Sequence, residues 1–128
     1  MRTLLLLSIL AAPAPVLCAD TQPTGFFSNM HYVGQTGDVI GDEVFIVYSR
    51  EGYFAYVQCA EGSPGLPVIV PVKLKGLDVE FSIPEKSGSQ CSGATFSGRV
   101  SKTELSGKWR YPNVSHDAVL KRRRSYWQ

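Results

Sequence analysis

FSGRVSKTELSGKW, residues 96–109, carries the strongest structural signal in this chain. Its two halves, FSGRV and LSGKW, flank a polar SKT turn. In each half the apolar residues share one face and Ser, Arg or Lys the other, which is the period of a strand with one buried face. Gly98 and Gly107 each remove a side chain where the sheet must bend or accept a neighbouring ring. The stretch predicts a coiled hairpin around a narrow core.

Two further hairpins are expected upstream of this one. Residues 42–49 (DEVFIVYS) and 53–59 (YFAYVQC) are β-branched and aromatic runs around a tight REG turn. Residues 67–75 (PVIVPVKLK) and 78–83 (DVEFSI) alternate apolar and polar side chains on either side of a Gly-Leu turn. Because Pro71 has no amide hydrogen to donate, its strand is expected at a sheet edge or with a bulge.

Residues 29–33 and 118–126 add one strand before and one strand after these hairpins. The total is about eight strands, and no stretch shows convincing helical spacing. Consecutive hairpins imply a single antiparallel meander, and closing it removes the exposed edges that template aggregation. We therefore expect an all-β fold with residues 20–128 as one domain. A small up-and-down barrel is the first expectation and an open β-sandwich the second.

The N-terminus has the order of a secretory leader. Residues 1–3 carry one positive charge, residues 4–12 are apolar except for Ser8, and a small residue stands at Ala19. We expect a signal peptide over residues 1–19, cleaved near Ala19, and export to the periplasm or the extracellular space. No later stretch approaches the ~20 apolar residues of a membrane helix, so stable membrane insertion is not expected.

The cysteines support this compartment. Of the three, Cys18 leaves with the leader, and Cys59 and Cys91 remain as a pair. A pair in an oxidising compartment predicts a disulfide, since a reactive thiol or metal ligand would need neighbours that these two lack. Closing a loop of about 33 residues would stabilise the fold by roughly 3 to 4 kcal/mol.

Charge gives little indication of a partner overall. One of the 13 basic side chains leaves with the leader, so the mature chain is almost balanced by its 11 acids. This balance and export argue against nucleic acid as a partner. In the KRRR run at 121–124, Arg122 and Arg124 share a strand face with Leu120. If Leu120 points inward, the two arginines must either line an anion-binding pocket or form ion pairs with acidic side chains. Pairing is the first expectation, with Asp42, Glu43 or Glu51.

Aromatic residues are concentrated in the expected strands. Such rings could line a ligand cavity, but a barrel of about eight strands is just wide enough to be filled by its own side chains. Core filling is the first expectation. Large rings in the terminal SYWQ are expected to dock on the barrel mouth or on a partner. The candidate residues for binding a ligand or partner are Arg122, Arg124, Trp109, Tyr126 and Trp127.

Catalytic and metal-binding patterns are weak. Residues 115–117 (SHD) are adjacent, so in an extended chain they point to opposite sides; a polar loop is expected there, not a triad. His31 and His116 lack the further ligands of a zinc site. Acids crowd residues 36–43 without the spacing of an EF-hand, which favours a solvated turn over calcium. These acids are Asp38, Asp42 and Glu43. We predict no catalytic residue, no metal and no cofactor.

The repeated F-x-G-x-V and L-x-G-x-W, followed by AVLKR at 118–122 as a closing strand, resembles the second half of small exported bacterial proteins with lipocalin-like or avidin-like barrels. The resemblance covers about residues 91–126. It implies the barrel architecture and transfers no site residue.

These observations favour a monomeric, non-enzymatic binding module for a small apolar or anionic ligand or for a protein partner. The alternative is an inhibitor or immunity-type protein that inserts a loop into an enzyme, for which residues 60–66 (AEGSPGL) are the candidate, since a rigid loop lowers the ordering cost of binding. A hydrolase is the least supported function, because no nucleophile and base, or pair of carboxylates, shows a suitable spacing.

Overall fold

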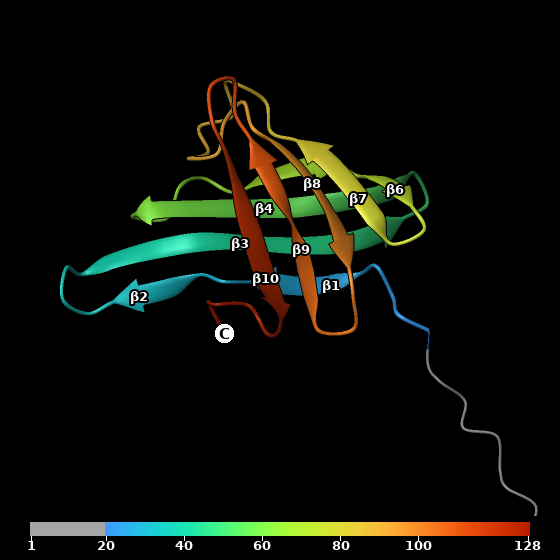
Figure 1. The fold of residues 1–128 in the computed structure, drawn as a ribbon, viewed down its shortest axis with the longest axis horizontal. Helices are drawn as coiled ribbons and strands as arrows, with labels where there is room; N and C mark the ends of the chain where they lie inside the picture. The colour runs from blue at the N-terminus through green and yellow to red at the C-terminus, as the bar shows by residue number, and fades with distance from the viewer. Residues whose placement is uncertain (1–19) are drawn as a thin grey trace, which may run out of the picture.

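A computed structural model describes residues 20–128 of the protein, so the expected signal peptide lies outside the described residues. This part of the chain is all-β and contains ten strands (Figure 1). They are β1 (Gly25–Ser28), β2 (His31–Val33), β3 (Asp38–Ser49), β4 (Gly52–Gly62), β5 (Val68–Pro71), β6 (Lys73–Lys75), β7 (Asp78–Ser82), β8 (Thr95–Val100), β9 (Glu104–Arg110) and β10 (Ser115–Arg122). Within these residues no helix offers an apolar stretch long enough to cross a membrane.

The strands form one antiparallel sheet in the order β5-β4-β3-β1-β10-β9-β8-β7-β6. The two ends of this order, β5 and β6, are consecutive in the chain and are separated only by Val72. The sheet is therefore a nearly closed barrel, in which β8–β10 cross in front of β3 and β4 (Figure 1). The expectation of an up-and-down barrel is confirmed.

Two of the expected strands are each interrupted by a bend, so each of them accounts for two of the ten strands: β1 with β2, and β5 with β6. β1 and β2 both pair with β3, and the break between them is held by Asn29, which donates from its amide to Asp42 O and accepts from Asp42 N at its side chain. Residues 68–75 are broken at Val72, directly after Pro71, and the Val72 amide donates to Tyr53 O at 2.9 Å. With each bent pair taken as one strand, the expected number of about eight is met, and Pro71 lies in an edge strand as predicted.

All three expected hairpins are present, and two of the terminal predictions need correction. The first strand begins at Gly25 rather than at residue 29, because β1 precedes the bend. The last strand covers Ser115–Arg122 rather than 118–126. Residues 115–117 are therefore not a loop: they pair with β9, and this pairing extends the strand toward Arg110. Arg124 lies beyond the strand end.

The core is built on the two glycines of the third hairpin. Gly98 and Gly107 are paired across β8 and β9, and the Phe96 ring lies over them. A Cβ placed on Gly107 would be 2.6 Å from Gly98 Cα and 2.7 Å from Phe96 Cζ. Phe96 packs against Trp109 at 5.1 Å and against Phe81 at 5.2 Å between ring centroids. The glycines thus make room for an aromatic cluster that fills the barrel interior.

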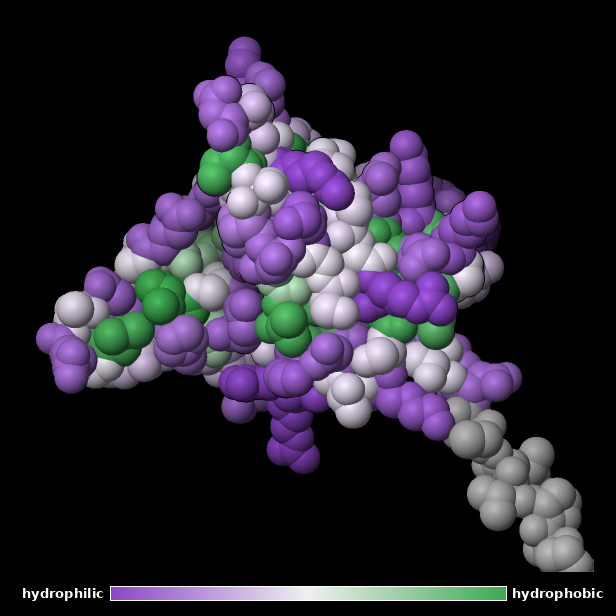
Figure 2. All heavy atoms as spheres, in the orientation of Figure 1, coloured by the Kyte–Doolittle hydropathy of each residue, from purple (hydrophilic) through white to green (hydrophobic). Residues whose placement is uncertain are grey.

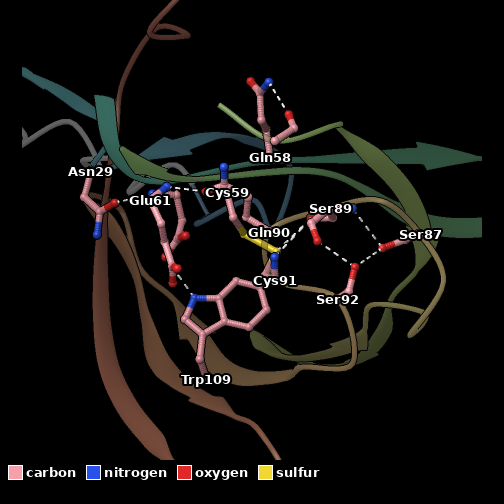
Figure 3. The surroundings of a disulfide bond; sticks show 12 residues. Asn29, Gln58, Cys59, Glu61, Ser87, Ser89, Gln90, Cys91, Ser92 and Trp109 are labelled. Carbon is pink, nitrogen blue, oxygen red and sulfur yellow. Dashed lines mark hydrogen bonds between the residues drawn. A yellow bond between two sulfur atoms is a disulfide. The ribbon is translucent and has the colours of Figure 1, made fainter. Parts of the chain in front are cut away.

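The disulfide expected between Cys59 and Cys91 is present. It joins the end of β4 to the loop between β7 and β8, and both sulfurs are buried beside Trp109 (Figure 3). The bridge fixes a long irregular segment, residues 83–94, against the far side of the sheet.

Replacing Gly107 by Ala should lower the free energy of unfolding by about 2 kcal/mol or more, because backbone atoms and the Phe96 ring block the added methyl group. Gly34→Ala is the matched control, since its added methyl group would meet only one atom, at 3.9 Å. Urea denaturation of both variants measures the difference. Equal stability of the two variants would contradict this account of the core.

Candidate functional site

The barrel interior is occupied by side chains. Trp109, a candidate binding residue, is buried in the aromatic core, and its indole Nε1 donates to Asp42 Oδ2 at 3.0 Å. Figure 3 shows its ring directly beside the disulfide. Trp109 therefore faces core residues and not a ligand. Of the rings expected to fill the core, Trp109 does so, whereas Tyr32 and Tyr48 are exposed; the other rings in the core are those of Phe27, Phe81 and Phe96.

The acids of residues 36–43 do not form a solvated turn, and that expectation is wrong. The turn ends at Gly37, and Asp42 and Glu43 are neighbours within β3, so their side chains lie on opposite faces of the sheet. Asp42 points inward to Trp109 and Glu43 points outward. Among residues 20–128 no group of three or more His, Cys, Asp or Glu side chains is placed to hold a metal ion.

Burial raises the pKa of Asp42 above its usual 3.8. The hydrogen bond from Trp109 and the charge of His116 act in the opposite direction, and the charge of Glu61 adds to the effect of burial. The charged form of Asp42 is consequently disfavoured in the folded protein relative to the unfolded chain.

Arg122 faces inward with Leu120, as expected, but its partners are not the expected acids. Within the described residues its guanidinium donates to three backbone carbonyls: Nη1 to Thr24 O at 2.7 Å, and Nη2 to Gln22 O at 2.7 Å and Ser101 O at 3.0 Å. The group also lies 4.6 Å from the centre of the Phe27 ring. Desolvation lowers the pKa of Arg122, which stays charged at neutral pH. Arg122 thus clamps the segment before β1.

The outer surface of β1, β3, β4 and β5 is apolar across four neighbouring strands. Strand register places Phe26 opposite Phe45, Phe45 opposite Tyr56, and Tyr56 opposite Ile69. The Phe26 and Phe45 rings are stacked at 4.1 Å, and Ile69 is 72% exposed. A second apolar cross-strand pair, Val47 with Phe54, lies beside this row. We name this surface the aromatic face: Phe26, Phe45, Val47, Phe54, Tyr56 and Ile69.

The outer surface of β6–β10 has the opposite character. Four cross-strand ion pairs cover it: Lys73–Glu80, Arg99–Asp78, Lys108–Asp117 and Lys121–Glu104. The hydrogen bond and charge of Lys108 hold the pKa of Asp117 below its usual value. Figure 2 shows this side as mainly hydrophilic, and the aromatic face is turned away from that view. The apolar character is therefore specific to one side of the barrel.

The C-terminal tail, residues 125–128, docks on the apolar side. Ser125 Oγ and the Tyr126 amide donate to the two carboxylate oxygens of Glu43, at 2.5 and 2.7 Å. Trp127 Nε1 donates to Gln58 Oε1 at 2.8 Å. Tyr126 and Trp127 form an edge-to-face ring pair at 4.9 Å. The tail was expected at the barrel mouth or on a partner, and the structure places it instead on the outer wall of the barrel.

The loop expected at residues 60–66 is shorter than predicted, because residues 60–62 are the end of β4 and pair with β3. The remaining residues, 63–66, adjoin the same surface, and the segment is held by several tertiary bonds. Gln58 Nε2 donates to Gly65 O at 3.0 Å, and the Gln90 side chain bonds both Glu61 N and Ser63 O. Figure 3 shows Gln90 beside the disulfide, which anchors both segments. Gln58 thereby connects the loop to the tail through its two amide atoms.

Of the predicted binding residues, the structure brings Tyr126 and Trp127 together, leaves Arg124 exposed just before them, and places Trp109 and Arg122 elsewhere. The aromatic face, Gln58 and the contact of Glu43 with the tail were not predicted. The apolar run from residue 44 to residue 48 does not alternate, and this signal of a strand covered on both faces could have indicated them.

No protein-family model, curated protein or solved structure matches this chain. The resemblance of residues 91–126 to lipocalin-like and avidin-like barrels therefore stays a prediction.

Asp42→Asn should increase the free energy of unfolding near pH 7, because it removes a charge that burial disfavours and keeps an acceptor for Trp109. A raised folded-state pKa means that stability falls as pH rises through it, so the gain should vanish below the usual pKa of 3.8. Urea denaturation at both pH values measures this. Asp117→Asn is the control. Because Lys108 stabilises the charged form of Asp117, this substitution should not stabilise the protein near pH 7. Stabilisation by Asp117→Asn, or no stabilisation by Asp42→Asn, would contradict this account of the Asp42 pKa.

Proposed function

We propose that the chain is an exported, non-enzymatic binding module that recognises a protein partner through the aromatic face. The observation that carries this proposal is the apolar row of Phe26, Phe45, Tyr56 and Ile69 on the outside of a barrel whose inside is filled. Exposed apolar surfaces of this kind mark interaction sites. Aromatic side chains are also enriched in the buried centres of interfaces.

The border of the aromatic face favours a partner with acidic groups. Arg123 and Arg124 follow β10 and are exposed, and the Arg123 amide donates to Phe26 O at 3.1 Å. An apolar protein patch flanked by carboxylates would complement this arrangement. A small ligand is less favoured, because the depressions on residues 20–128 are open surface grooves, such as one of about 470 Å³ beside β6 and β7.

Export is part of the proposal. The Cys59–Cys91 disulfide supports an oxidising compartment, as the expected leader at residues 1–19 does. We propose a monomer that works without a cofactor or a nucleic acid. A hydrolase is not favoured, because Asp42 and Glu43 lie on opposite faces of β3.

A second candidate is an enzyme inhibitor that acts through residues 60–66. The bonds from Gln58 and Gln90 hold this loop in place, and Leu66 at its end is 64% exposed. A rigid loop with an exposed aliphatic side chain suits insertion into an apolar enzyme cleft. Leu66→Asp should abolish binding if this loop is the contact, and should leave it unchanged if the aromatic face acts alone.

Ile69→Lys should reduce capture of the partner at least about tenfold, because it places a charge where an apolar side chain would be buried. The assay compares affinity capture from the exported fraction of producing cells by the wild-type chain, by Ile69→Lys and by Val119→Lys. Val119, on the ion-paired side, is 46% exposed and serves as the matched control. Capture that is lost in both variants, or unchanged in Ile69→Lys, would contradict the proposal.

A further inference from the structure

Glu43 is the one charged side chain among residues 20–128 that is fully buried, with 1% exposure. It lies on the outer wall of the barrel, and what covers it is the C-terminal tail. Both hydrogen bonds to its carboxylate come from that tail, from Ser125 Oγ and from the Tyr126 amide. A buried carboxylate is costly unless it is hydrogen-bonded, so this position requires donors from a covering segment.

Gln58 provides a second polar point in the same place. It is opposite Glu43 in the β3–β4 register and is also buried. Its Oε1 accepts from the indole of Trp127, while its Nε2 is fixed by Gly65 O. Glu43 and Gln58 together present oriented acceptors for a hydroxyl, a backbone amide and a side-chain N–H. This set of donors describes a peptide segment.

The tail fills this site only in part. Trp127 is 54% exposed, and a groove of about 250 Å³ remains between the tail and the aromatic face. Its lining includes Phe26, Phe45 and Tyr56. A segment that makes the same polar contacts and also fills the groove would bury more apolar surface than the tail does.

We propose that the groove over Glu43 and Gln58 is a peptide-binding site, for which the C-terminal tail is the resident ligand. The ligand class is a peptide segment that carries a Ser or Thr hydroxyl, the next backbone amide and an aromatic residue. The partner of the aromatic face would insert such a segment and displace the tail. In that respect the inference rests on the proposed function, but the site can be tested without the partner.

Displacement is feasible because residues 125–127 are held by few bonds. The chain leaves the sheet at Arg122, and three hydrogen bonds to Glu43 and Gln58 hold residues 125–127. A tethered segment competes with an effective concentration of roughly millimolar, so a free peptide binds the intact chain more weakly than a chain without the tail.

The test uses the synthetic peptide Arg-Ser-Tyr-Trp-Gln, which repeats residues 124–128, and the mature chain truncated after Arg124. Isothermal titration should show saturable binding to the truncated chain and at least about tenfold weaker binding to the intact chain. Replacing Ser by Ala in the peptide should weaken binding about tenfold, as expected for a lost hydrogen bond to a charged acceptor.

Glu43→Gln in the truncated chain should also weaken peptide binding about tenfold or more. Glu104→Gln is the matched control, since Glu104 is a carboxylate on the ion-paired side, and it should leave binding unchanged. Thermal unfolding first establishes that each chain is folded. If truncation prevents folding, the full-length double variant Ser125→Ala, Trp127→Ala, whose tail is loosened, replaces it.

Absence of saturable binding to a folded chain with a removed or loosened tail would overturn the proposal. Equal binding to the intact chain would also overturn it, because the peptide would then bind elsewhere. These results are separate from the capture assay: peptide binding that persists when Ile69→Lys leaves capture unchanged would retain the groove and reject the aromatic face as the partner site.

Discussion

The packing of Phe96 over Gly98 and Gly107 is the contact on which the rest of the structure depends. Side chains at the two glycine positions would occupy the space of the ring and of the facing backbone. Their absence lets β8 and β9 curl around Phe96, Phe81 and Trp109, and these rings fill the barrel. A filled interior removes the space in which a small barrel would hold a ligand, which is why we propose a binding site on the outer wall.

The outer wall is divided into two sides of opposite character. On β6–β10 successive ion pairs and polar side chains keep the surface hydrated, as is usual for an antiparallel sheet with one solvated face. On β1, β3, β4 and β5 aromatic and aliphatic side chains line up across four strands, and the chain's own C-terminus covers part of them. β3 contributes to the core with one face and to this outer surface with the other. Its consecutive residues show this, since Asp42 contacts Trp109 in the core and Glu43 holds the tail.

Local patterns in the sequence were sufficient to predict the three hairpins, the edge position of Pro71 and the disulfide pair. Alternation and turn residues can be read from short segments, and the cysteine pair follows from a simple count. Other features depend on residues far apart in the chain. Arg122 bonds to Thr24 O across 98 positions, and Ser125 bonds to Glu43 across 82. Neither partner can be identified from local spacing, and for this reason an inward arginine was expected to need an acid and a buried glutamate was expected to be solvated. The bend between β1 and β2 was missed because Asn29 closes it with bonds to β3.

The central claim is that this protein acts through the aromatic face and not through its interior or its charged side. Site-specific photo-crosslinking tests it most directly, with a photoreactive amino acid placed at Ile69 or at Val119, both exposed strand positions on opposite sides of the barrel. The account predicts a discrete crosslinked complex from position 69 in the exported fraction of producing cells and none from position 119. A complex formed only from position 119, or from neither position, would contradict it.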